Sequence, residues 1–242
     1  MVGEDLIDRE CNVILEPVDG QPDGAEEFDH VHVVLLGDST LDNARYLNAN
    51  SSEFSVHRHM YYRCVENGWS CTLLAQDGSV LDDVLQYQIP HIPETATHVV
   101  LSASGNDLLM LLNEMVSANF TASALYRGFV SGLREVSDRY RNLVSILKKI
   151  GCHIACSTVY QPAFSNPVFK SLAAVGLGMH NSRLTQIAVD CDVSIIDFFT
   201  LFDYPEDFSN ALELSSRGGA KLAENVVQFV SDHPTVAMSR HR

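Results

Sequence analysis

Three short polar motifs contain the residue types that ester hydrolysis needs. They are GDSTLDN at 37–43, DGS at 77–79 and SGND at 104–107. A serine hydroxyl attacks an acyl carbon, and backbone or amide N–H groups stabilise the oxyanion that develops. Ser39 supplies a hydroxyl, Gly78 a backbone N–H that a substrate can approach closely, and Asn106 a side-chain amide. Each motif by itself is also typical of a simple turn or helix cap.

Each motif follows a short apolar segment that we expect to be a buried β-strand. Five such segments are rich in β-branched residues and end in polar or glycine-containing turns. They are HVVLLG (32–37), CTLLAQ (71–76), HVVLSA (98–103), CHIACSTV (152–159) and VSIID (193–197). Ligands of open α/β sheets bind at the carboxyl ends of the strands. We therefore expect the three motifs to meet at that edge of the sheet.

Amphipathic segments between these strands predict the crossover helices. The candidates are 55–66, 80–89, 122–149, 180–190 and 216–231. The pattern is strongest at 122–149, where apolar residues recur every three or four positions. Ser215 or Ser216 is the expected cap of the last helix. Strands that alternate with helices predict one α/β domain, in which helices cover both faces of a parallel sheet.

The three motifs, in this order and at this spacing, resemble those of the SGNH hydrolases, often called the GDSL family. The resemblance covers Val33 to about Val227, which is most of the chain. It implies a flavodoxin-like three-layer α/β/α sandwich with a five-stranded parallel sheet. Neither a metal nor an organic cofactor is implied.

The same resemblance assigns roles to individual residues. It implies Ser39 as the nucleophile, with Gly78 and Asn106 as further donors to the oxyanion. The neighbouring Asp38 and Asp107 take supporting positions in these motifs.

The fourth motif of the family is altered in this chain. The family usually ends with Asp-x-x-His before a glycine-containing helix, where the histidine is the general base and the aspartate orients it. The matching stretch here is NALELSSRGGAKLAENV at 210–226. Alignment on its Ser-x-x-Gly step puts Glu213 at the histidine position and Asn210 at the aspartate position. It resembles a branch of the superfamily in which Glu-Pro-Ser replaces His-Pro-Ser, with Leu214 as the middle residue here.

The substitution leaves three hypotheses for the base. Glu213 only caps or salt-bridges the last helix, or it forms a dyad with Ser39. A carboxylate is a weak base unless desolvation raises its pKa. In the third hypothesis the base comes from another loop. The candidates there are His180, His57 and His59. His180 follows a long connection at 159–179 that is suited to a lid. Asp42 and Asp197 are expected to be structural or to hold a partner.

Two functions of different classes are consistent with these residues. The first is a hydrolase of small carboxylic esters, and the second is a non-catalytic relative that binds a ligand or partner. The missing Asp-x-x-His favours the binder, whereas the retained Ser39, Gly78 and Asn106 oppose it. A third reading, a nucleotide-binding flavodoxin-like protein, lacks both GxGxxG after the first strand and GxxxxGK[ST].

The charge of the chain is concentrated at its beginning. Residues 1–30 contain ten acidic residues and one basic residue, so the net charge of −15 leaves −6 for the other 212 residues. An acidic protein repels nucleic acid and anionic membranes, and we expect neither as a partner. We divide the chain into an acidic extension (1–30), a catalytic-type domain (31–232) and a tail (233–242). The extension is expected to be a solvated tail or an interaction arm, with a weak edge-strand signal at Cys11–Val18.

The composition also bears on the compartment. No apolar run approaches the ~20 residues of a membrane span, and no secretory signal is visible. The six cysteines form no CxxC pair and no zinc-type cluster. We expect buried free thiols, with Cys152 and Cys156 on one face of a strand, and a reducing cytoplasmic location. The expected partner is a small-molecule ester, and the oligomeric state is left open.

Overall fold

The computed structural model describes residues 30–48, 52–117, 122–202 and 204–235 of the 242-residue chain. The acidic extension, the edge strand expected at Cys11–Val18 and most of the expected tail lie outside these residues. Within them, the apolar segments form five parallel strands in the order β2-β1-β3-β4-β5. Their bounds are β1 (His32–Gly37), β2 (Ser70–Leu73), β3 (His98–Ser102), β4 (His153–Ser157) and β5 (Ser194–Ile196).

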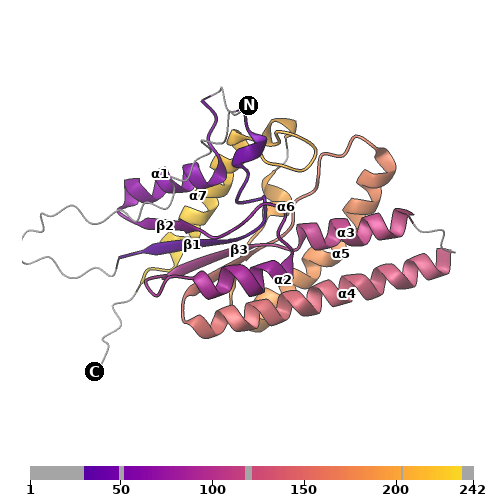
Figure 1. Cartoon of the computed structure of the whole chain (residues 1–242), viewed down its shortest axis with the longest axis horizontal. Coiled ribbons are helices and arrows are strands. Elements are labelled where there is room, and N and C mark those ends of the chain that lie inside the picture. The colour runs from indigo at the N-terminus through magenta and orange to yellow at the C-terminus, as the bar shows by residue number, and fades with distance from the viewer. Residues whose placement is uncertain (1–29, 49–51, 118–121, 203, 236–242) are drawn as a thin grey trace, which may run out of the picture.

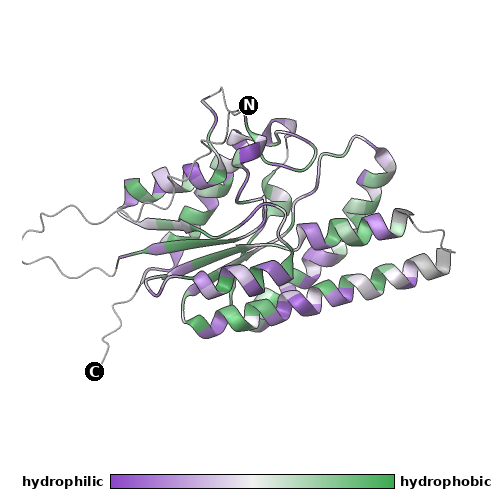
Figure 2. Cartoon of the chain, viewed as in Figure 1, coloured by the Kyte–Doolittle hydropathy of each residue, from purple (hydrophilic) through white to green (hydrophobic). Residues whose placement is uncertain are grey.

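Helices cover both faces of this sheet, which gives three layers (Figure 1). Alternate residues of β1 point to opposite faces. Val33 and Leu35 pack against α1 (Val56–Asn67), α6 (Phe198–Leu201) and α7 (Ser216–Asp232). On the other face, Val34 and Leu36 pack with α2 (Leu81–Asp83), α3 (Gly105–Ser117), α4 (Ala122–Leu147) and α5 (Pro167–Cys191). The apolar residues of strands and helices therefore meet inside, as the colours of Figure 2 show.

The predicted fold class is confirmed. The sheet is parallel and five-stranded, as a flavodoxin-like three-layer sandwich requires. The first strand begins and ends where the sequence predicted, and the other four are shorter than expected. The segment predicted at 80–89 is a short α turn followed by a π turn (η2, Val84–Gln88) and a 3-10 turn (η3, Ile89–His91).

The prediction of a long connection at 159–179 is wrong for residues 167–179, because α5 already begins at Pro167. Proline is favoured at the first helical position, and the Asn166 side chain accepts a hydrogen bond from Phe169 N at 3.2 Å. The glycines 176 and 178 lower helix propensity, but α5 packs along α4, and this contact compensates for them. Helix α3 was not predicted, because its run of LLMLL hides the helical period.

The five described cysteines are free. Cys64 and Cys156 are buried, whereas Cys71, Cys152 and Cys191 are only half-buried, so the expectation of burial was too strong for these three. Cys152 and Cys156 do pack into the same apolar cluster. Among the described residues, no helix is long and apolar enough to cross a membrane.

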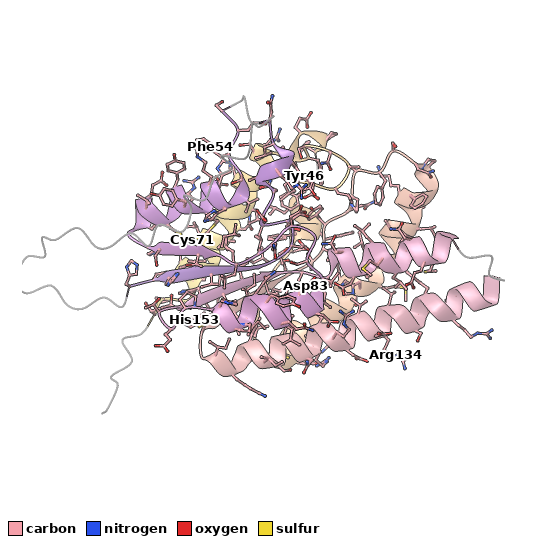
Figure 3. All side chains as sticks on the ribbon, in the orientation of Figure 1. Tyr46, Phe54, Cys71, Asp83, Arg134 and His153 are labelled. Carbon is pink, nitrogen blue, oxygen red and sulfur yellow. The ribbon has the colours of Figure 1, made fainter. Side chains whose placement is uncertain are left out.

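The two ends of the strands differ in chemistry. At the amino ends, His153 of β4 stacks on His98 of β3 with ring centroids 5.1 Å apart (Figure 3 labels His153). The carboxyl ends carry the three polar motifs instead. The candidate site therefore lies at the edge of the sheet that the sequence predicted.

Candidate active site

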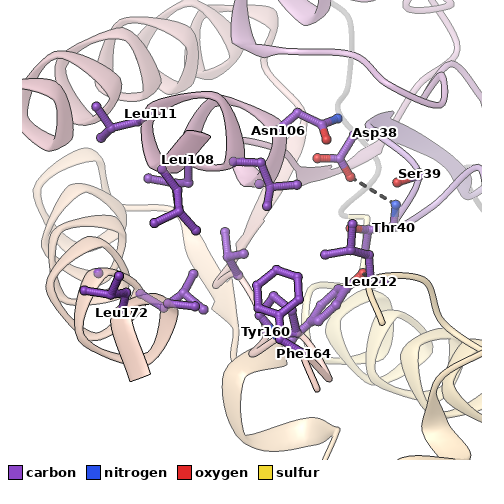
Figure 4. A pocket seen from close by; sticks show the side chains of 18 of the residues that line it. Asp38, Ser39, Thr40, Asn106, Leu108, Leu111, Tyr160, Phe164, Leu172 and Leu212 are labelled. Atoms are coloured by element: carbon purple, nitrogen blue, oxygen red, sulfur yellow. Dashed lines mark hydrogen bonds between the residues drawn. The ribbon is translucent and has the colours of Figure 1, made fainter. Parts of the chain in front are cut away.

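The turn after β1 presents Ser39 and requires a glycine at its start. Gly37 has a φ of +142°, and a Cβ there would lie 1.7 Å from the backbone oxygen of Ser102 in β3. Without a side chain at this position, Asp38 N can donate to the same oxygen at 3.2 Å. Thr40 N then donates to the Asp38 carboxylate at 3.0 Å (Figure 4). The chain thus reverses sharply and leaves Ser39 at the wall of a cavity.

Ser39 and Glu213 lie 174 positions apart in the sequence and form a hydrogen bond in the structure. The Ser39 hydroxyl donates to Glu213 Oε1 at 3.1 Å. The Glu213 side chain is nearly buried, with 7% exposure. Its second oxygen, Oε2, is buried with no hydrogen-bond partner among the described residues. One carboxylate oxygen thus accepts the Ser39 hydrogen bond, and the other has no donor among the described residues.

Burial raises the pKa of Glu213 to about 7. Its hydrogen bond from Ser39 opposes this rise, whereas the negative charges of Asp38 and Asp77 add to it. Burial also raises the pKa of Asp38 to about 6, against the lowering effect of its hydrogen bonds from Thr40. A base is most effective when its pKa lies near the working pH. Glu213 therefore has the basicity that an ordinary exposed glutamate lacks.

The loop that carries Glu213 is held by two asparagines. Asn210 Oδ1 accepts from Leu212 N at 2.8 Å and from Glu213 N at 3.0 Å. Asn43, which is fully buried, donates from Nδ2 to the Leu214 carbonyl at 2.9 Å. Asn43 thereby ties the Ser39 loop to the Glu213 loop. Sequence reasoning missed this role, and the only signal was the position of Asn43 at the end of the GDSTLDN motif.

The other two motifs contact each other beside Ser39. Gly78 lies in the turn after β2 with a φ of +81°, which favours glycine. Asn106 Nδ2 donates to the Ser79 carbonyl at 2.9 Å, so this turn and the SGND motif are adjacent. A side-chain amide has two N–H donors, and this hydrogen bond uses one of them. Asn106 lines the same cavity as Ser39, whereas Gly78 is not part of the cavity wall.

Gln88 joins the first and second motifs, and sequence reasoning missed it. Its Nε2 donates to the Gly37 carbonyl at 2.8 Å and to Ser79 Oγ at 3.2 Å. Its Oε1 accepts from Gly37 N at 2.8 Å. Gln88 ends the π turn η2, and such turns often occur near functional sites. A π turn leaves no pattern in the sequence that could have marked this residue.

Three of the aspartates that the sequence analysis named stabilise turns and helix starts near the site through hydrogen bonds from backbone N–H groups. Asp107 accepts from Leu81 N at 3.1 Å and pairs with Arg139 at 3.0 Å. Asp42 accepts from the backbone N–H of Asp77 at 3.0 Å and so fixes the turn at 77–79. Asp197 accepts from Phe199 N at the start of α6.

The structure does not bring the candidate histidines to Ser39. His180 is fully buried, and its Nε2 lies 2.9 Å from the Ser104 hydroxyl. Burial lowers the pKa of His180 to about 4. His59 Nε2 lies 3.1 Å from the Ser216 hydroxyl instead. Within the described ranges, no ring nitrogen of any histidine, His57 included, hydrogen-bonds to Ser39, and no three His, Cys, Asp or Glu are grouped as metal ligands.

An apolar cavity opens beside the Ser39–Glu213 pair. Its walls come from three helices (α3, α4 and α5) and from the loop after β4 (Figure 4). The polar residues Asp38, Ser39, Asn106 and Glu213 belong to this wall together with many leucine and phenylalanine side chains. Such a cavity with a few convergent polar groups is the usual form of a ligand site.

The chain matches no protein-family model and none of the curated proteins. Solved structures share its fold. The extracellular lipase from Streptomyces rimosus has a TM-score of 0.64 at 14% identity, over 83% of this chain and 100% of the lipase. Phospholipase A1 from Streptomyces albidoflavus has a TM-score of 0.62 at 13% identity, over 83% and 100%. A GDSL-like lipase from Bacteroides thetaiotaomicron has a TM-score of 0.57 at 13% identity, over 83% and 88%. This chain therefore has the fold of GDSL-type hydrolases.

Proposed function

We propose that this protein is a serine hydrolase of small carboxylic esters, in which Glu213 replaces histidine as the general base. The observation that carries the proposal is the 3.1 Å hydrogen bond from the Ser39 hydroxyl to a buried carboxylate. The pKa of about 7 supports it, because this carboxylate can accept a proton at neutral pH. The fold shared with lipases and esterases agrees with the reaction type.

The reaction follows from these groups in two steps. Ser39 Oγ attacks the ester carbonyl carbon while its proton moves to Glu213. The N–H group of Ser39 and the amide of Asn106, two residues that line the cavity, stabilise the oxyanion, and the resemblance assigns the Gly78 N–H as a third donor. The tetrahedral intermediate then breaks its bond to the alcohol oxygen, which takes the proton from Glu213. In the second step, water gives a proton to Glu213 and attacks the acyl-enzyme, and Ser39 regains that proton as the acid leaves.

The loss of the aspartate at position 210 is consistent with this mechanism. In a serine triad the aspartate fixes the tautomer and orientation of the imidazole. A carboxylate base has no tautomer to select, so it needs only a fixed position. Asn210 and Asn43 supply that position through hydrogen bonds with the backbone of residues 212–214.

Hydrolysis of p-nitrophenyl acetate by the full chain tests the proposal. We expect Ser39→Ala to lower kcat/KM by at least about 10³-fold. A fluorophosphonate probe should label the wild-type protein at Ser39 and leave the variant unlabelled. Equal turnover by wild type and variant would refute the mechanism. Ligand binding without any turnover would instead favour the non-catalytic relative, which is the alternative to an enzyme.

Several wider expectations remain proposals. They are the domain limits at 30 and 232, a cytoplasmic location, and the absence of nucleic-acid partners. The negative charge of the chain supports the last of these.

A further inference from the structure

The cavity beside Ser39 continues as an apolar slot between α3, α4 and α5. Two successive turns of α3 line it, from Asn106 to Leu112. Phe129 and Leu133 of α4 and Leu172 and Leu177 of α5 form the other walls. In Figure 4, Leu111 and Leu172 lie at the end of the slot away from Ser39. The polar groups of this wall are confined to the Ser39 end, so the rest of the slot suits a hydrocarbon.

The length of the slot follows from helix geometry. The six-residue step from Asn106 to Leu112 advances about 9 Å along the axis of α3. An extended alkyl chain with bonds of about 1.5 Å spans this length with roughly eight carbon atoms. A two-carbon acyl group would leave most of the leucine surface without a partner.

Two glycines let the helices form this slot. Gly132 of α4 lies under Leu111, and a Cβ there would come within 2.4 Å of the Leu111 side chain. Gly176 of α5 is buried in the slot wall, and a Cβ there would lie 3.0 Å from Phe129 Cζ. Gly176 therefore keeps the space in front of the Phe129 ring open.

The direction of the slot indicates which half of the ester it receives. The leaving alcohol oxygen must face Glu213, because this residue returns the proton. Glu213 and Leu212 line the cavity, and Leu212 lies at its Ser39 end in Figure 4, whereas the slot extends from Asn106 along α3. A carbonyl oxygen directed at Asn106 therefore leaves the acyl chain on the side of the slot.

We propose that this slot binds a linear, medium-chain acyl group of about eight carbon atoms, and that Gly176 sets its depth. The proposal rests on the proposed function, since it assumes that Ser39 is acylated. It names the substrate class as esters of medium-chain fatty acids with a small alcohol.

A chain-length series tests the acyl assignment. We expect kcat/KM for p-nitrophenyl esters to rise about two- to fourfold for each methylene from acetate to octanoate, as burial of apolar surface requires, and to level off beyond it. The isomers ethyl octanoate and octyl acetate have the same composition but carry the long chain on opposite sides of the ester. The octanoate should be hydrolysed at least about tenfold faster. A preference for octyl acetate, or a flat series, would overturn the proposal.

Two glycines of the same helix provide a matched pair of variants. Gly176→Leu places a side chain in the slot, whereas Gly178 is exposed and has no heavy atom within 4 Å of its Cβ position. Both changes raise helix propensity. Gly176→Leu should lower the octanoate-to-acetate ratio of kcat/KM by about tenfold or more, and Gly178→Leu should leave this ratio unchanged. Equal ratios in the two folded variants would refute the role of Gly176.

A binding measurement tests the acyl slot independently of the proposed hydrolase activity. Calorimetry with Ser39→Ala should detect methyl octanoate at a concentration where methyl acetate gives no signal. One outcome would refute the acyl slot but support the proposed hydrolase. In it, the probe labels Ser39 and the acetate ester is hydrolysed, but the octanoate ester is neither bound nor preferred. If Gly176→Leu fails to fold, as its melting curve would show, Gly176→Ala is measured in the same series and should show the same direction of change.

Discussion

Replacement of Glu213 by glutamine tests both the chemistry and the energetics of the site. The change keeps the size of the side chain but removes the carboxylate that accepts the Ser39 proton. Activity should fall by at least about 10³-fold, as strongly as in Ser39→Ala, because the two residues act as one unit. The double variant Ser39→Ala with Glu213→Gln should be no less active than either single variant.

The same replacement, which removes activity, should increase the stability of the folded protein above pH 4.5. The pKa of Glu213 is raised from 4.5 to about 7 in the folded protein. The stability contributed by this group is therefore complete below pH 4.5 and is lost as the pH rises through about 7. At 1.36 kcal/mol per pKa unit, this loss amounts to about 3 kcal/mol at pH 8. Glutamine does not ionise, so Glu213→Gln should gain up to that amount relative to wild type between pH 4.5 and pH 8.

Urea unfolding of both proteins at pH 4.5 and pH 8 measures this difference. A gain of about 3 kcal/mol corresponds to a Tm higher by roughly 6–12 °C for a chain of this size. Glu94→Gln is the control, because Glu94 is exposed in the loop before β3. A Glu213→Gln variant that keeps its turnover, or whose stability relative to wild type is the same at both pH values, would refute the proposed base.

Further predictions concern the pH profile and the scaffold. For wild type, kcat/KM should increase with pH through about 7 as Glu213 loses its proton, and a rate independent of pH between 5 and 9 would contradict this. Asn43→Ala should cost about 2–6 kcal/mol in urea unfolding, because two buried backbone groups lose their partner. Gly37→Ala should fail to give a cooperative thermal transition, because its Cβ has no room against β3. Burial lowers the pKa of His180 from 6.5 to about 4, so the folded protein should lose about 3 kcal/mol of stability as the pH falls from 6.5 to 4. His180→Gln should reduce this loss in acid unfolding curves.

The sequence alone was sufficient for the layers of the fold and for the edge that holds the site. Both the bounds and the burial of strand β1 were predicted correctly, because a run of β-branched residues that ends in glycine is a local pattern. The starts of α1 and α7 were predicted to within one residue, because an amphipathic pattern is also local. Helix α3 and the first half of α5 were missed, because LLMLL has no visible period and the two glycines in α5 resemble those of a loop.

Only the tertiary structure decided which group meets Ser39. The sequence left Glu213, His180, His57 and His59 as alternatives, since residue type and spacing do not show which of them approaches Ser39. The Ser39–Glu213 distance depends on every element between the two residues, and on the Asn43 contact that joins their loops. The basicity of Glu213 depends on its burial. Neither quantity is a property of residue type or spacing, because both arise when distant segments exclude water from the same place.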